Sequence, residues 1–148
     1  GLNILAQIIE KRVDTEQLFE TRQQVLDLVE ASGGHVRQLM QMVRSTCQTA
    51  STQKHDKIQA EDVLYAIKKQ QFNFERFVPD DHYPLLAKVC LSKNITKDET
   101  GQLMLFNTSV LEYNGLERWN YPNPAVRSSD LFKSALKALM DEGSRDNG

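Results

Sequence analysis

The sequence predicts a mainly α fold in two parts, with one β-hairpin in the second part. Apolar residues recur at helical spacing through most of the chain. The pair Asn114-Gly115 separates two short runs rich in aromatic residues, which is a strong hairpin signal. The segment 71-QFNFERFVPDD-81 carries three phenylalanines and then a proline, and we place the boundary between the parts here.

Four helices are predicted in the first part, at about 3–13, 20–31, 35–51 and 59–69. Asp14-Thr15-Glu16 breaks the first helix, and Ser32-Gly33-Gly34 stops the second, because glycine accepts the left-handed conformation of a helix end. The third and fourth helices each have an apolar stripe that we expect to face inward. These stripes are Val36, Leu39, Met40, Val43, Cys47 and Ala50 in the third, and Val63, Leu64 and Ile67 in the fourth.

The second part is predicted as helix 83–94, a short helix at about 97–106, a hairpin within 108–121 and a last helix at about 129–141. Pro84 suits the first turn of a helix, and both central residues of a type I′ turn at Asn114-Gly115 need positive φ. The hairpin loop can exceed two residues, since Leu116 and Glu117 intervene. The last helix should turn four apolar residues inward, namely Leu131, Phe132, Leu136 and Leu139.

This order of elements is that of a small winged-helix-like unit. The predicted domains are therefore residues 1–78, a helical bundle, and residues 79–142, the winged-helix-like unit. Residues 143–148 should form a disordered tail.

The stretch 31-ASGGHVRQLMQMVR-44 holds the first candidate site, made of Gly33, Gly34 and Arg37. Two glycines leave the backbone bare, and the start of the following helix presents free N–H groups that suit an anion. Arg37 adds a planar fork of donors that matches phosphate oxygens. A cation at a helix start is destabilising by about 0.3–1 kcal/mol, a cost that a bound phosphate would reverse. The alternative is a plain helix junction with a solvated arginine.

The order of the first four helices, with 32-SGGHVRQLM-40 followed by 58-IQAEDVLYAI-67, resembles the helical lid subdomain of AAA+ ATPases. The pattern looks nearest to the branch with origin-initiator ATPases and STAND-like relatives. In that family a Gly-x-x-Arg pattern opens a lid helix, and the resemblance implies that Arg37 is the second-sensor arginine. The family often places a winged helix after the lid. The resemblance covers residues 3–70 well and 83–127 loosely.

No phosphate-binding loop occurs in the chain, because none of its glycines is followed by lysine. No apolar strand ends in paired acids that would hold magnesium. We therefore expect no ATP hydrolysis by these residues and no cofactor in them. Since a helix begins almost directly after Gly1, we expect a fragment of a longer protein. The resemblance implies that ATP and Mg²⁺ bind an N-terminal core, which would be the first partner of this lid.

The second candidate site is an interaction surface on the hairpin, with Tyr113, Arg118, Trp119 and Tyr121 as contacts to another protein or protomer. Packing of these aromatic residues within the hairpin is the alternative. Two other functions stay open. One is DNA binding by the winged helix, for which the short helix offers only Gln102 as a base-reading residue. The other is a histone-fold-like interaction module within residues 40–72.

Charge argues against a nucleic-acid partner. Residues 1–79 hold ten basic and ten acidic side chains, and residues 80–148 hold eight and ten. Neither part has the basic excess that drives binding to a phosphate backbone. No apolar run reaches the length of a membrane span, so we expect a cytoplasmic protein with no membrane contact.

Cysteines and histidines predict no further site. Cys47 and Cys90 lie within apolar helical patterns and should be buried free thiols. The histidines, His35, His55 and His82, are scattered without ligand spacing, so we predict no metal site.

Overall fold

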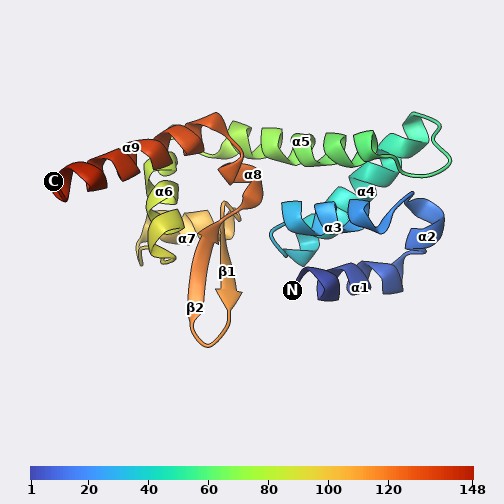
Figure 1. Ribbon diagram of the computed structural model, residues 1–148, viewed down its shortest axis with the longest axis horizontal. Helices are drawn as coiled ribbons and strands as arrows, with labels where there is room; N and C mark the ends of the chain where they lie inside the picture. Colours follow the sequence, from blue (N-terminus) through green and yellow to red (C-terminus); the bar gives the residue numbers. More distant parts are fainter. The chain divides into compact units, whose positions relative to one another are not determined.

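The computed structural model describes all 148 residues and confirms a mainly α fold with one antiparallel hairpin (Figure 1). The chain forms two compact units, residues 1–72 and 73–148. This division differs from the predicted boundary at 78/79, because helix α5 (Ala60–Phe77) continues through the phenylalanine-rich segment. No glycine or proline interrupts the helix before Pro79, and Phe74 is buried in the core of the second unit.

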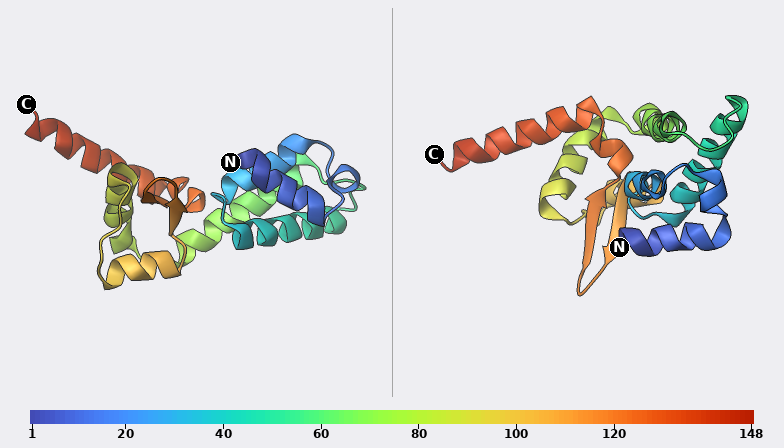
Figure 2. Two further views of the ribbon diagram at one scale, coloured as in Figure 1. Left: turned by 90° about the horizontal axis from the view of Figure 1, so that it is seen from below. Right: turned by 45° about the vertical axis from the view of Figure 1, so that its right-hand side comes forward.

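The first unit contains four helices and the beginning of α5 (Figure 2). They are α1 (Leu2–Arg12), α2 (Thr15–Leu18), α3 (Arg22–Ala31) and α4 (Val36–Thr52). Helix α1 packs on α3, and α3 packs on α4. The short helix α2 was missed from the sequence, where Asp14 looked like a breaker. Its carboxylate instead caps this helix by accepting from the Gln17 N–H at 3.3 Å.

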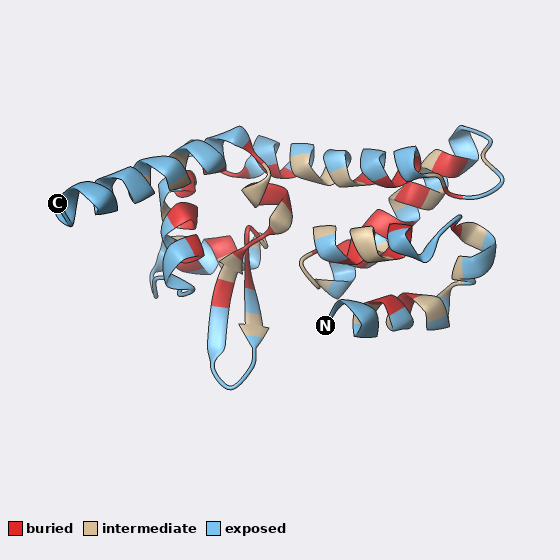
Figure 3. Cartoon of the chain, viewed as in Figure 1, coloured by how far each residue is buried: buried red, intermediate tan, exposed pale blue.

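Each helix of the first unit contributes one side to a common core. The largest fully buried apolar side chains here are Ile9, Val25, Leu28, Val29 and Leu39. Figure 3 shows the same one-sided burial along α5. Two apolar residues that we predicted to be inward are exposed, Val36 at 41% and Leu64 at 51%. Each of these two residues lies at the edge of the apolar stripe of its helix, and the neighbouring helices do not cover that edge.

The second unit packs helices against each other and against one hairpin. Its elements are a 3₁₀ turn η1 (Asp80–His82), α6 (Tyr83–Ser92), α7 (Glu99–Phe106), β1 (Val110–Asn114), β2 (Arg118–Pro122), α8 (Pro124–Arg127) and α9 (Asp130–Asp146). Helix α6 contacts α9 and β2, and α7 contacts β1. The core includes Leu86, Met104, Val110, Val126 and Phe132.

Strands β1 and β2 pair in an antiparallel register that sets Asn114 opposite Arg118. The loop is therefore the three residues 115–117. Gly115 does not adopt positive φ, so the type I′ turn expected at Asn114-Gly115 is not formed. A two-residue loop of type I′ would require positive φ at both Asn114 and Gly115. The three-residue loop does not impose this requirement.

Helix α9 extends to Asp146, whereas the sequence predicted its end near 141 and a disordered tail at 143–148. Gly143 is tolerated inside it, since one glycine costs a helix only about 1 kcal/mol. Leu131, predicted to face inward, is 51% exposed, while Phe132 is buried. No helix of the chain is both long and apolar enough to cross a membrane.

Candidate functional site

The glycine pair between α3 and α4 adopts the left-handed conformation that the sequence predicted. Gly33 has φ 64° and Gly34 has φ 80°. The fully buried hydroxyl of Ser32 donates to the Val29 carbonyl at 2.7 Å and accepts from the Gly34 N–H at 3.2 Å. A β-carbon on Gly34 would lie 3.3 Å from Cδ1 of Leu5 in α1. The junction is thus a closed turn held against α1.

His35 caps the start of α4. Its Nδ1 atom accepts the Gln38 N–H at 3.3 Å, so this ring nitrogen carries no proton. Burial lowers the pKa of His35, and the positive charge of Arg37 lowers it further. The imidazole is therefore neutral at pH 7. The N–H groups of Val36 and Arg37, in the first turn of α4, have no acceptor within the helix.

Arg37 is exposed and forms no ion pair. Its exposure agrees with the sequence prediction, which placed it beside the inward stripe. An unpaired guanidinium, two open N–H groups and the positive end of a 17-residue helix meet on one exposed surface. This surface can accept a phosphate or another anion.

Neither of two grooves in the first unit reaches Arg37. One, of about 770 Å³, lies among α1, α2 and α3, and its Arg22 is already bonded to Glu10 at 2.8 Å. The other, of about 520 Å³, runs between α4 and α5. Arg37 is exposed and lines neither groove.

The predicted hairpin surface is only partly assembled. Tyr113, Trp119 and Tyr121 share one face of the ribbon, with ring centroids 4.5 Å apart for Tyr113 and Trp119 and 6.1 Å apart for Trp119 and Tyr121. Arg118 lies on the other face, since successive strand residues alternate, and its Nε is 3.7 Å from Glu112. Trp119 is 40% exposed. Packing within the hairpin therefore covers these aromatic rings only in part, and part of Trp119 stays accessible.

Two cations that sequence reasoning missed complete this aromatic face. Lys93 Nζ lies 3.9 Å and Arg127 Cζ 4.6 Å from the ring centroid of Tyr121. Lys93 comes from the end of α6, where it has φ 61°, and Arg127 comes from α8. Both contacts are tertiary, so no spacing in the sequence indicated them. They fix Tyr121 in place and add positive charge beside the exposed Trp119.

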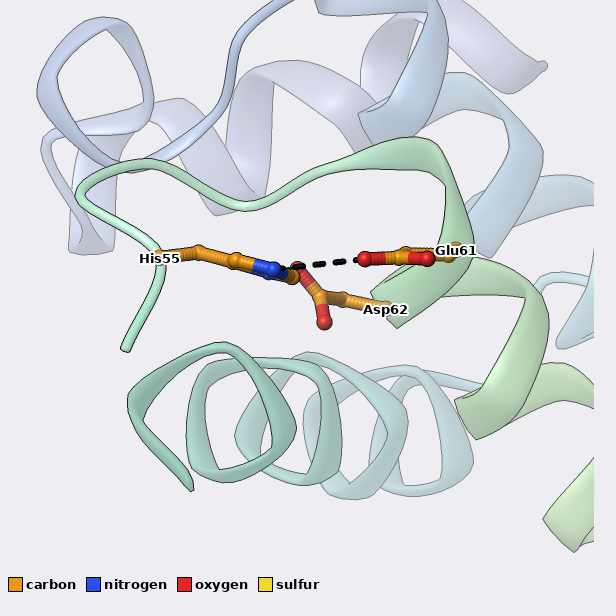
Figure 4. A group of neighbouring side chains, drawn as sticks. All are labelled: His55, Glu61 and Asp62. Carbon is orange, nitrogen blue, oxygen red and sulfur yellow. Dashed lines mark hydrogen bonds and ion pairs between the residues drawn. The ribbon is translucent and has the colours of Figure 1, made fainter. Parts of the chain in front are cut away.

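A third cluster joins His55, Glu61 and Asp62 between the end of α4 and the start of α5 (Figure 4). His55 Nδ1 lies 2.9 Å from Asp62 Oδ2, and His55 Nε2 lies 3.2 Å from Glu61 Oε1. The hydrogen bond to Asp62 raises the pKa of His55. Partial burial opposes this rise, while the negative charges of Asp62, Glu61 and Glu20 support it.

This cluster was not predicted from the sequence, because the fold brings the loop histidine against the next helix. The available signal was a histidine six and seven residues before two acids that open a helix.

The prediction that both cysteines are free thiols was confirmed. Cys47 and Cys90 are both free, with Cys90 buried and Cys47 half-buried.

Comparisons of the chain with protein-family models, with curated proteins and with solved structures found no match.

Proposed function

We propose that this chain is the nucleotide-responsive lid and winged-helix-like part of an AAA+ ATPase. In this proposal Gly33, Gly34 and Arg37 face the phosphates of ATP bound, with Mg²⁺, to a core formed by other residues. The second unit then meets another protein or protomer. The place of action is the cytoplasm.

The observation that carries the proposal is the start of α4. An arginine in the first turn, where a cation is unfavourable by about 0.3–1 kcal/mol, has no acidic partner and stays exposed. Such an arrangement is expected where an anion supplies the missing charge. The exposure of Arg37 is compatible with a ligand held on a separate core.

In this proposal ATP is hydrolysed by residues of the core and not by residues of this chain. The chain has no phosphate-binding loop, and phosphoryl transfer depends on positioning the γ-phosphate, Mg²⁺ and water together. Arg37 would stabilise charge on the phosphates, and a charge-assisted contact of this type contributes about 1.5–3 kcal/mol.

Helix α5 is the element that we propose couples the two units. It contributes Val63 to the core of the first unit and Phe74 to the core of the second. Nucleotide binding at Arg37 would thus alter the second unit by moving elements as rigid bodies.

A protein partner fits the second unit better than DNA does. The exposed side of α7 carries Leu103, 47% exposed, and Phe106, 87% exposed, together with Gln102. The hairpin loop adds Leu116, which is fully exposed. Apolar contacts suit a protein surface, whereas DNA binding requires basic residues toward the phosphates.

The test uses the gene product that contains these residues together with those encoded before them. The proposal expects a Walker loop there and Mg²⁺-dependent ATPase activity. Arg37→Ala should lower kcat/KM for ATP by roughly 10- to 150-fold, which corresponds to losing about 1.5–3 kcal/mol. Arg44→Ala, at another exposed position of α4, is the matched control and should stay within twofold. Equal kinetics for both variants, or a gene product without ATPase activity, would remove the proposed function.

A further inference from the structure

The cluster of His55, Glu61 and Asp62 is held by the backbone on both sides. The His55 N–H donates to the Ala50 carbonyl at 2.9 Å, which closes the C-terminus of α4 in a Schellman arrangement. Asp62 lies in the first turn of α5, and its Oδ2 also accepts the Gln59 N–H at 2.9 Å. The histidine and the Asp62 carboxylate are therefore fixed before any ligand arrives, whereas Glu61 stays exposed.

The loop that carries His55 is also tied to the segment after α2. Ile58 and Phe19 form a parallel bridge, with the Ile58 N–H donating to the Leu18 carbonyl at 2.7 Å. This pairing brings Glu20 near enough for its charge to act on His55. Two carboxylates contact the imidazole directly, and the charge of Glu20 acts on it from the segment after α2.

The distances match the arrangement in which a carboxylate orients a metal-binding histidine. Oδ2 of Asp62 lies 2.9 Å from Nδ1 of His55. This contact directs the other ring nitrogen, Nε2, toward Glu61. Two ligands of a tetrahedral zinc ion, at bond lengths of about 2.0 Å, lie roughly 3.3 Å apart. The Nε2 of His55 and Oε1 of Glu61 are 3.2 Å apart, so one ion fits between them after a small outward shift of the exposed Glu61.

A second observation points to a missing positive charge. The side chain of Asp62 is 1% exposed, and its Oδ1 atom is buried without a hydrogen-bond partner. A buried carboxylate with one oxygen unsatisfied is costly. The single positive charge of an imidazolium would face two carboxylates, Asp62 at Nδ1 and Glu61 at Nε2, whereas a divalent ion at Nε2 would match both charges and keep the Nδ1–H on Asp62.

We propose that His55 and Glu61 bind a divalent transition-metal ion, with zinc as the best match, and that Asp62 orients the histidine from behind. Water completes the coordination, because Glu61 is 69% exposed. Imidazole and carboxylate form the donor set that zinc accepts, whereas Mg²⁺ prefers oxygen ligands alone. The site joins α4 to α5, so an ion there stabilises the first unit. It is independent of the proposed nucleotide site.

The test is a zinc titration of the whole chain, with histidine ring resonances followed by long-range ¹H–¹⁵N correlation. Zinc should shift the Nε2 signal of His55 while Nδ1 keeps its proton. The rings of His35 and His82 should not change. Thermal unfolding of the first unit should move to higher temperature with zinc and return on adding a chelator.

Variants separate the metal site from a simple ion pair. Glu61→Gln should weaken zinc binding at least tenfold, and Asp62→Asn should weaken it by about 10- to 100-fold. Glu99→Gln is the matched control, since Glu99 is also an exposed acid in the first turn of a helix, and it should bind zinc as the unmodified chain does. If excess zinc leaves the His55 signals unchanged, or Glu61→Gln binds zinc normally, the cluster is an ion-paired junction and the proposal is wrong.

Discussion

Replacing Gly34 by alanine tests the geometry on which the Arg37 surface depends. Gly34 has φ 80°, a conformation that a β-carbon makes unfavourable by about 1–2 kcal/mol. The added β-carbon would also lie 3.3 Å from Cδ1 of Leu5, a tight contact that a flexible side chain can relieve. We therefore expect Gly34→Ala to lower the free energy of unfolding of the first unit by about 1–2 kcal/mol.

Calorimetric unfolding measures this loss. For a unit of about 70 residues, 1 kcal/mol corresponds to roughly 4–8 °C in Tm, so Gly34→Ala should lower the Tm of the first unit by about 4–16 °C. Gly33→Ala should act similarly, since Gly33 has φ 64°. Gly33→Asn should lose less, because asparagine tolerates the left-handed region.

Gly143→Ala is the matched control. Gly143 lies in helix α9 with nothing within 4 Å of an added β-carbon. Alanine there should leave stability unchanged or raise it by up to about 1 kcal/mol. If Gly33→Ala and Gly34→Ala unfold like the parent chain, the closed turn before α4 does not exist in solution, and the placement of Arg37 derived from it is wrong.

Three further results are expected. Gly101→Ala should destabilise the second unit by about 3 kcal/mol or more in denaturant unfolding, because its β-carbon would lie 1.9 Å from the Thr96 carbonyl oxygen. Lys54→Gly should raise Tm, since Lys54 has φ 59° after the end of α4 and glycine removes about 1 kcal/mol of strain. Burial and Arg37 lower the pKa of His35, so the stability that its neutral cap contributes is present above pH 6.5 and is lost as the pH falls through its folded value. Unfolding from pH 7 to pH 5 should show this loss in the parent chain and not in His35→Asn, which caps without titrating.

The sequence predicted those features that depend on neighbouring residues. The helical stripes located most helices within a few residues, and the glycine pair located the left-handed turn before α4. Arg37 was correctly expected to be exposed, because the buried stripe of Leu39, Val43 and Ala50 occupies the opposite side of α4. Local chemistry controls each of these features.

The side-chain contacts that were missed depend on how the chain folds back on itself. His55 meets Asp62 because the loop after α4 turns back onto the start of α5, seven residues further on, and Lys93 meets Tyr121 because α6 packs beside the hairpin. Helix α5 was expected to end near 69, yet burial of Phe74 in the second core extends it.

The two candidate sites of the first unit lie at opposite ends of α4. With 17 residues and a rise of 1.5 Å per residue, this helix separates them by roughly 25 Å. Both sites arise from the same property of a helix, namely that its first N–H groups and last carbonyl groups lack partners within it. At the start these N–H groups are partly open beside Arg37, and at the end His55 closes the carbonyls. Substitutions this far apart, with no shared partner, should have additive effects on stability within about 0.5 kcal/mol. Arg37→Ala combined with Glu61→Gln therefore tests whether the two ends of α4 are independent, because a larger deviation from additivity would mean that they are energetically coupled.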